Sequence, residues 1–119
     1  MTWTVEYTDE FLKWWQRLDE GEQESLRASV GLLEECGPQL ARPHADSVKG
    51  SRHANMKELR TQHDGRPYRT FFAFDPRRTA ILLIGGDKTG DKQFYQRMIP
   101  EADRLFDEYL EELRQEGIL

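Results

Sequence analysis

The sequence predicts an α+β domain, in which helices cover an antiparallel sheet of about four strands. Three observations indicate this class. Two segments with helical periodicity come first, three strand candidates joined by short turns follow, and one long amphipathic segment ends the sequence. The length of 119 residues fits one domain over residues 1–119 with its own hydrophobic core.

The N-terminal third predicts a short strand and then a helical hairpin. Residues 3–7 alternate between apolar and polar side chains, as in a half-buried strand. Thr8 or Asp9 suits a helix N-cap, Gly21 interrupts the helical pattern, and Gly37-Pro38 ends it. The apolar positions are Phe11, Leu12, Trp15 and Leu18 in the first helix, and Leu26, Val30 and Leu33 in the second.

A loop and three strands are expected in the middle of the sequence. Residues 38–55 show no period and contain two prolines, which predicts a long ordered loop. The strand candidates are Met56–Thr61, Pro67–Phe74 and Thr79–Gly85. The short connections between them favour antiparallel pairing. The last candidate contains four consecutive large apolar residues, so we expect a central strand buried on both faces.

The last predicted element is an amphipathic helix over Gln93–Gln115. Its apolar side chains recur at helical spacing on one face, which indicates packing against the sheet. Pro100 should either kink this helix or begin a second one.

The charges are sorted into three blocks. Residues 1–41 carry three Lys/Arg against nine Asp/Glu, residues 42–97 carry twelve against six, and residues 98–119 carry two against seven. The net charges are therefore −6, +6 and −5. A basic middle within an acidic protein can present a positive surface to a polyanion, although such blocks are also found as solvated faces without a partner.

The rest of the composition limits the cellular location of the protein and the kinds of catalytic or metal site that it can contain. The single Cys36 excludes an internal disulfide and fits a reducing compartment. We find no signal peptide and no apolar run long enough to span a membrane, so we expect a cytoplasmic protein without membrane contact. The three histidines lack metal-ligand spacing and no Gly-x-Ser-x-Gly element occurs, so we expect neither a metal, a cofactor nor a serine nucleophile.

A tight turn at Asp64-Gly65 would define the register of the first hairpin. The opposed pairs would be His63 with Arg66, Arg60 with Arg69, and Glu58 with Phe71. Two arginines directly opposite each other repel, so a stable hairpin needs an anion or Glu58 to neutralise them. Arginine binds phosphate bidentately, which favours an anion site over two arginines on a solvated face.

A glycine-rich segment, residues 85–92, leads from the last strand into the last helix. Its glycines permit close backbone approach, but the spacing of a Walker P-loop is absent. Lys88 and Lys92 would emerge at the same end of the sheet as Tyr95. The segment therefore supplies two further cations, Lys88 and Lys92, in addition to the pair of Arg60 and Arg69.

These segments together resemble the RelE/HigB toxin superfamily of type II toxin–antitoxin systems, nearest to its HigB-like, phage-derived branch. The resemblance covers roughly residues 3–110. It rests on Glu58-Leu59-Arg60, Pro67–Phe72, Leu82–Lys88 and the Arg42-Pro43 loop. It implies a RelE-like fold, with two N-terminal helices on one face of an antiparallel sheet and a C-terminal helix.

The resemblance also implies an activity and partners. Members of the superfamily are metal-free endoribonucleases (mRNA interferases) that cut mRNA on the ribosome, inhibit translation, and are held inactive by a co-encoded antitoxin. We expect the antitoxin to be a small helix-turn-helix protein. In the implied reaction the ribose 2′-OH attacks the adjacent phosphate, while basic residues stabilise the developing charge.

The resemblance also assigns residues by position. Arg69 would contact the reacting phosphate, and Arg60 is the matching arginine on the neighbouring strand. Lys88 would protonate or stabilise the leaving oxygen, and Tyr95, or alternatively Phe94, would stack on a base. Family lysines that accept a proton fall here on Met56 and Glu58, so Glu58 is either the base or a salt-bridge partner of Arg60. Further expected RNA contacts are Lys57, Arg66, Lys92, His53 and His63, and the two histidines are alternative bases.

Two other functions remain open on the sequence. ParE-like relatives share the fold, bind DNA gyrase and cleave nothing. A degenerate, non-catalytic interaction domain would also fit, because family lysines are missing and the net charge of −5 is unusual for a ribosome-binding toxin.

Overall fold

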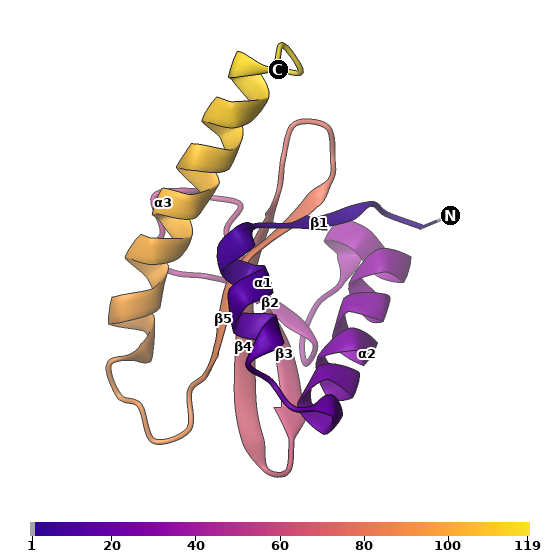
Figure 1. Cartoon of the computed structure of the whole chain (residues 1–119), viewed down its shortest axis with the longest axis vertical. Coiled ribbons are helices and arrows are strands. Elements are labelled where there is room, and N and C mark those ends of the chain that lie inside the picture. Colours follow the sequence, from indigo (N-terminus) through magenta and orange to yellow (C-terminus); the bar gives the residue numbers. More distant parts are fainter. Residues whose placement is uncertain (1) are drawn as a thin grey trace.

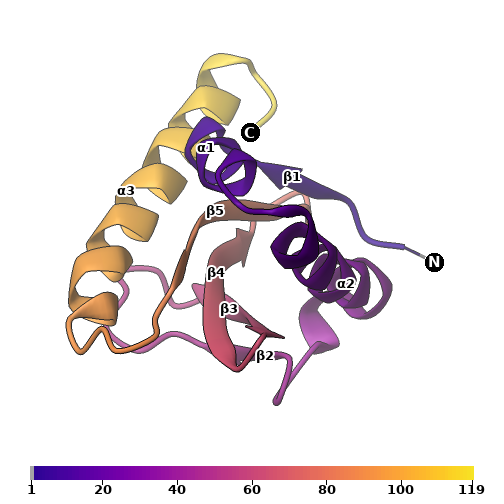
Figure 2. The same cartoon turned by 60° about the horizontal axis from the view of Figure 1, so that its bottom comes forward.

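A computed structural model describes residues 2–119 and contains one five-stranded sheet between helices (Figure 1). The sheet has the order β1-β5-β4-β3-β2. In chain order the elements are β1 (Val5–Tyr7), α1 (Asp9–Gln16), α2 (Glu20–Cys36), the 3₁₀ helix η1 (Gly37–Gln39), β2 (Ala45–Ser47), β3 (Lys57–His63), β4 (Arg66–Phe74), β5 (Ala80–Asp87) and α3 (Phe94–Gln115). The α+β class is confirmed, with α1 and α2 on one face of the sheet and α3 on the other (Figure 2).

The sheet is mixed, and this corrects the expectation of a fully antiparallel one. Strands β2 to β5 pair antiparallel, but β1 pairs parallel with β5. Short connections imply antiparallel neighbours only for strands that follow one another, and β1 is separated from β5 by more than seventy residues. The fifth strand, β2, lies inside the predicted loop 38–55, because three residues are too few to show a period.

The helix boundaries follow from capping. Thr8 is the N-cap of α1, and its Oγ1 accepts a hydrogen bond from the Phe11 backbone N–H at 3.0 Å. Asp19 and Glu22 form a reciprocal capping box at the start of α2. Helix α3 runs through Pro100 as one element, so no second helix begins there. None of the helices within residues 2–119 combines the length and the apolar character that crossing a membrane requires.

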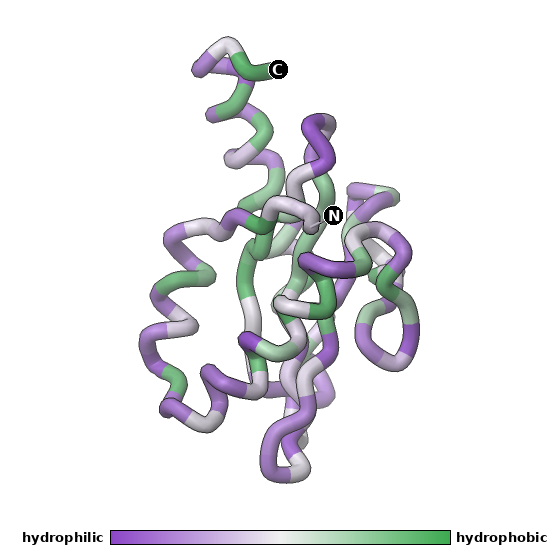
Figure 3. Tube along the Cα trace, turned by 90° about the vertical axis from the view of Figure 1, so that its right-hand side faces the viewer, coloured by the Kyte–Doolittle hydropathy of each residue, from purple (hydrophilic) through white to green (hydrophobic). Residues whose placement is uncertain are grey.

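Alternation along the strands creates two cores, one on each face of the sheet. Tyr68 and Phe72 of β4 pack beneath α1 and α2, whereas Phe71 and Ala73 pack beneath α3. Residues 80–83 of β5 are buried on both faces, which confirms the predicted interior strand. In Figure 3 the hydrophobic stretches accordingly follow the strands in the middle of the molecule.

Close packing at Gly85 leads to a stability prediction. A Cβ atom at this position would lie 2.2 Å from the ring of Trp14, which is buried. We expect Gly85→Ala to lower the free energy of unfolding by about 3 kcal/mol, because overpacking displaces a buried ring. Urea denaturation measures this change. The matched control is Gly31→Ala in α2, where a Cβ meets nothing within 4 Å and helix propensity should raise stability by about 0.5–1 kcal/mol.

Candidate functional site

The hairpin of β3 and β4 has the register that its turn predicts. Arg60 lies opposite Arg69, Glu58 opposite Phe71, and His63 opposite Arg66. Asp64 and Gly65 adopt positive φ angles of 49° and 74°, which a tight hairpin turn requires. Because Phe71 belongs to the core beneath α3, the side chains of Glu58, Arg60 and Arg69 lie on the α3 face.

Glu58 is the centre of this group. Its side chain is only 5% exposed. It accepts hydrogen bonds from the Tyr95 hydroxyl at 2.7 Å and from the Arg60 Nε at 3.1 Å, and the Arg69 Nε lies 3.8 Å from the same carboxylate. The single carboxylate thus offsets part of the repulsion between the two opposed arginines.

Arg69 retains unused binding capacity. Its side chain is 11% exposed, and one terminal nitrogen donates to the Tyr68 carbonyl at 2.9 Å. Its buried Nε has no hydrogen-bond partner among residues 2–119. A buried donor without an acceptor costs roughly 1–3 kcal/mol. The partly exposed terminal nitrogens are the atoms of this side chain that an incoming anion could reach.

A third cation lies at the end of β5. The Lys88 Nζ is 5.6 Å from the centre of the Tyr95 ring, and the Lys88 backbone N–H donates to the Pro67 carbonyl at 2.9 Å. In the part of the chain that the structure describes, no carboxylate lies within ion-pair distance of the Lys88 amine. Lys92 is exposed in the loop before α3, nearby in the chain.

We call this set the Glu58 cluster; its members are Glu58, Arg60, Arg69, Lys88 and Tyr95. Three cations against one carboxylate leave it with a net charge of +2. Asp46 of β2 lies 3.5 Å from Arg60 but is itself paired with Arg42 at 2.7 Å, so this second pair leaves the net charge unchanged. The cluster is therefore an electropositive site formed by β3, β4, the residue after β5 and the start of α3, and its charge suits a phosphate.

A hollow of about 580 Å³ lies between α2 and the end of β3 and reaches the arginines of the cluster. It is lined in part by Arg60 and Arg69, and by His44 and Gln62, which the sequence reasoning did not select. Asp46 was also missed, because only the short pairing of β2 with β3 brings it opposite Glu58. Residues 2–119 contain no group of three or more His, Cys, Asp or Glu side chains arranged to hold a metal ion.

Three of the expected RNA contacts lie on the opposite, α1/α2 face of the sheet. Lys57 donates to the Pro38 carbonyl at 3.2 Å, and the His63 Nδ1 lies 2.8 Å from the Ser25 hydroxyl. Arg66 lies 3.6 Å from both Glu22 and Asp87. The structure therefore does not bring these three residues into the Glu58 cluster.

His53 is also remote from the cluster. Its Nε2 lies 2.8 Å from Asp107 of α3, and its ring contacts Phe106 edge-on. Asp107 follows Tyr95 by twelve positions along the helix, which corresponds to about 18 Å. Of the carboxylate and the two histidines considered as bases, only Glu58 touches the arginines.

Three tyrosines that donate to carboxylates, one of them buried and two half-buried, predict an alkaline limit of stability. The pairs are Tyr68 with Glu22, Tyr95 with Glu58, and Tyr109 with Glu6. Burial and the hydrogen-bonded carboxylate raise the pKa of each phenol above its usual value of about 10. Above that pH the unfolded chain releases these protons and the folded chain retains them, so the free energy of unfolding should fall.

Urea denaturation between pH 8 and pH 11.5 tests this prediction. Above about pH 10 the free energy of unfolding should fall less steeply with pH in Tyr95→Phe than in the wild type, because the variant lacks one of the three phenols. Equal slopes in the two proteins would contradict the role assigned to the Tyr95–Glu58 hydrogen bond.

Comparison with known proteins identifies the family of the chain. Residues 13–107 match the family of phage-derived Gp49-like proteins (DUF891). Two Mycobacterium tuberculosis proteins described as candidate toxins, HigB2 and HigB3, are each 44% identical to this chain, over 91% and 82% of its length. The matched region spans about half (54%) of HigB2 and 85% of HigB3.

Solved structures share the fold. The isolated Escherichia coli RelE toxin superposes with a TM-score of 0.58 at 12% identity, covering 81% of this chain and 95% of RelE. The intact E. coli RelBE toxin–antitoxin complex gives a TM-score of 0.53 at 13% identity, covering 71% of this chain and 94% of the matched one. At such identities the likeness concerns the fold alone. Because residues 13–107 match the family model and two relatives are 44% identical, the chain belongs to the phage-derived Gp49-like family, which is of the RelE/HigB type.

Proposed function

We propose that the protein is the toxin of a type II toxin–antitoxin system and that it cleaves mRNA without a metal ion. The observation that carries the proposal is the Glu58 cluster, in which two opposed arginines lie beside one buried carboxylate and Lys88 lies over the ring of Tyr95. Membership of a family whose relatives include candidate toxins supports it.

The chemistry that fits the cluster is internal transesterification of RNA. The ribose 2′-oxygen bonds to the adjacent phosphorus, the bond from phosphorus to the 5′-oxygen breaks, and a 2′,3′-cyclic phosphate and a 5′-hydroxyl result. One proton leaves the 2′-hydroxyl and one is added to the 5′-oxygen. The reaction therefore requires a base, an acid and cations for the phosphorane-like charge.

Each role has one candidate in the cluster. Glu58 is proposed as the base, since the alternatives His53 and His63 lie elsewhere in the fold. Lys88 is proposed to protonate or stabilise the leaving oxygen, and Arg69 and Arg60 to bind the phosphate. Tyr95, whose hydroxyl donates to Glu58, would orient the carboxylate as well as stack on a base.

The proposed partners follow from the proposed toxin function. A co-encoded antitoxin, expected to be a helix-turn-helix protein, would hold the toxin inactive, as the RelBE complex of E. coli suggests for a relative of the fold. Messenger RNA on the ribosome is the proposed substrate, which places the activity in the cytoplasm.

The test compares the wild-type chain with a variant that lacks the central arginine. We expect tightly controlled expression of the wild type to stop growth and to fragment mRNA, with no such effect from Arg69→Ala. Assays with purified mRNA, with and without ribosomes, then show whether the ribosome is required. Inhibition of gyrase supercoiling without RNA cleavage would instead indicate ParE-like action, and unchanged growth with intact mRNA would overturn both toxin functions.

A further inference from the structure

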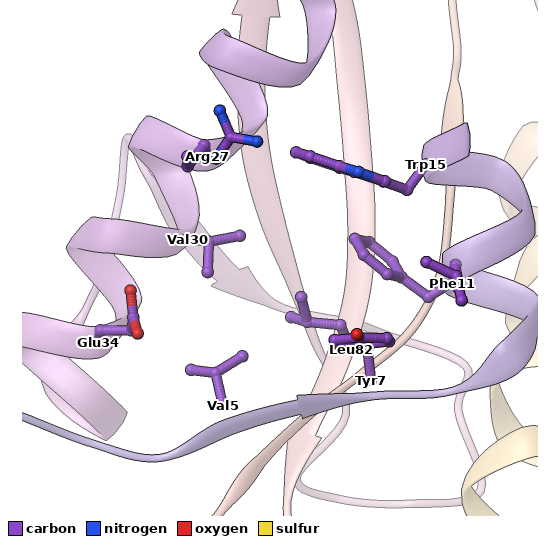
Figure 4. Close-up of a pocket in the computed structure, with 9 residues that line it drawn as sticks. Val5, Tyr7, Phe11, Trp15, Arg27, Val30, Glu34 and Leu82 are labelled. Carbon is purple, nitrogen blue, oxygen red and sulfur yellow. The ribbon is translucent and has the colours of Figure 1, made fainter. Parts of the chain in front are cut away.

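A second hollow lies on the α1/α2 face of the sheet. Helices α1 and α2 and strand β1 enclose a hollow of about 320 Å³ with Leu82 of β5 at its floor (Figure 4). Its walls are the apolar side chains of Val5, Tyr7, Phe11, Leu12, Trp15 and Val30. We call it the α1–α2 hollow. Its volume lies near the lower end of ligand pockets, enough for one or two large side chains.

One apolar residue at the rim of the hollow is exposed. Tyr7 is 57% exposed, although its ring lies 6.0 Å from that of the buried Phe11. Among residues 2–119, the other exposed large apolar side chains are Ile118 and Leu119, at the end of the chain. An exposed tyrosine beside an apolar hollow is a residue type that anchors protein interfaces.

The form of the hollow favours a helix over an added strand. Strand β1 is the edge of the sheet, but it is only three residues long and offers little backbone to pair with. The hollow lies instead between two helices, where the apolar stripe of a third helix can insert its side chains.

The charged residues around the hollow indicate which kind of helix would bind there. Arg27 lies over the Trp15 ring at 5.2 Å at one end of the hollow, and the exposed Glu34 lies at the other (Figure 4). Residues 1–41, which build β1, α1 and α2, have three basic residues against nine acidic ones. A helix that binds here gains from basic residues beside its apolar stripe.

We propose that the α1–α2 hollow is the docking site for a basic amphipathic helix of the antitoxin. This inference rests on the proposed function for the identity of the partner. The hollow and the Glu58 cluster lie on opposite faces of the sheet, since Val5, Trp15 and Val30 pack with one core and Phe71 and Tyr95 with the other. Docking of the antitoxin and binding of phosphate are therefore separable by mutation.

Titration calorimetry with the purified product of the adjacent gene tests the site. Tyr7→Ala and Glu34→Lys should each weaken binding about tenfold or more, because they remove an apolar anchor and reverse a complementary charge. Both residues are exposed, so folding should be preserved. The matched control for Glu34 is the exposed neighbour Glu35, which does not line the hollow; Glu35→Lys should change affinity by less than about threefold.

RNA cleavage by the same variants separates this inference from the proposed function. Tyr7→Ala and Glu34→Lys should cleave RNA as the wild type does and resist inhibition by the partner. Wild-type affinity in both variants, or no binding of the partner to the wild-type chain, would overturn the docking site whatever the cleavage assay shows. A dimer of the chain alone that Tyr7→Ala dissociates would also overturn it, because a second copy would then occupy the hollow.

Discussion

Replacing Arg69 by alanine is expected to lower the rate constant of RNA cleavage by about 10²–10³-fold, which is the usual cost of removing one preorganised donor to a charged transition state. Arg69 is held in an interior strand opposite Arg60, and its buried Nε has no acceptor among residues 2–119. The Nε itself is closed to solvent, so a phosphate would bind the terminal nitrogens, one of which already donates to the Tyr68 carbonyl. Single-turnover cleavage of an RNA substrate measures the effect.

Two variants make this result specific. Arg69→Lys keeps the charge but loses the planar fork, so we expect it to recover only part of the lost rate. Arg78→Ala removes an equally basic residue that lies over the Trp3 ring at the turn between β4 and β5, and it should leave cleavage unchanged. Equal losses in Arg69→Ala and Arg78→Ala would show that overall charge, and not a site, governs activity.

The register of the central hairpin could be predicted because it depends on local chemistry. The turn at Asp64-Gly65 and the two-residue period of a strand together determine which side chains oppose each other. Arg60 and Arg69 are opposed as predicted. The interior position of β5 could likewise be predicted, because uninterrupted apolar residues need cover on both faces.

The same two-residue period could have separated the candidate RNA contacts. Lys57 and His63 occupy odd positions in β3, so they face α2, whereas Glu58 and Arg60 face α3. Closeness in sequence therefore does not place two strand residues on the same face of the sheet. Arg66 was separated from the cluster for the same reason, on the partner strand.

Contacts between distant segments could not be predicted from the sequence. The pairing of His53 with Asp107 joins a loop without a period to the middle of α3. The parallel pairing of β1 with β5 and the place of Asp46 beside Arg60 depend equally on how the completed sheet is assembled. No local pattern of residue types specifies such contacts.

Replacing Glu58 by glutamine should have the second large effect, and it decides between the two roles open to this residue. As the base, Glu58 accepts the 2′-hydroxyl proton, and its loss should lower the cleavage rate about 10²–10⁴-fold. As a salt-bridge partner alone, it holds Arg60 and Arg69 in place. Glutamine preserves the shape and can accept from the Tyr95 hydroxyl, so the cluster should remain folded.

Binding and cleavage should change in opposite directions in Glu58→Gln. In the wild-type chain, the Glu58 carboxylate lies 3.1 Å from Arg60 and 3.8 Å from Arg69 and competes with RNA phosphate for both. The neutral amide of the variant removes that competition. RNA affinity should therefore rise while the rate constant at saturating RNA falls, which fluorescence anisotropy and single-turnover kinetics measure separately. Tighter binding with an undiminished rate would assign Glu58 to charge balance alone, and the base would then have to be sought outside the Glu58 cluster.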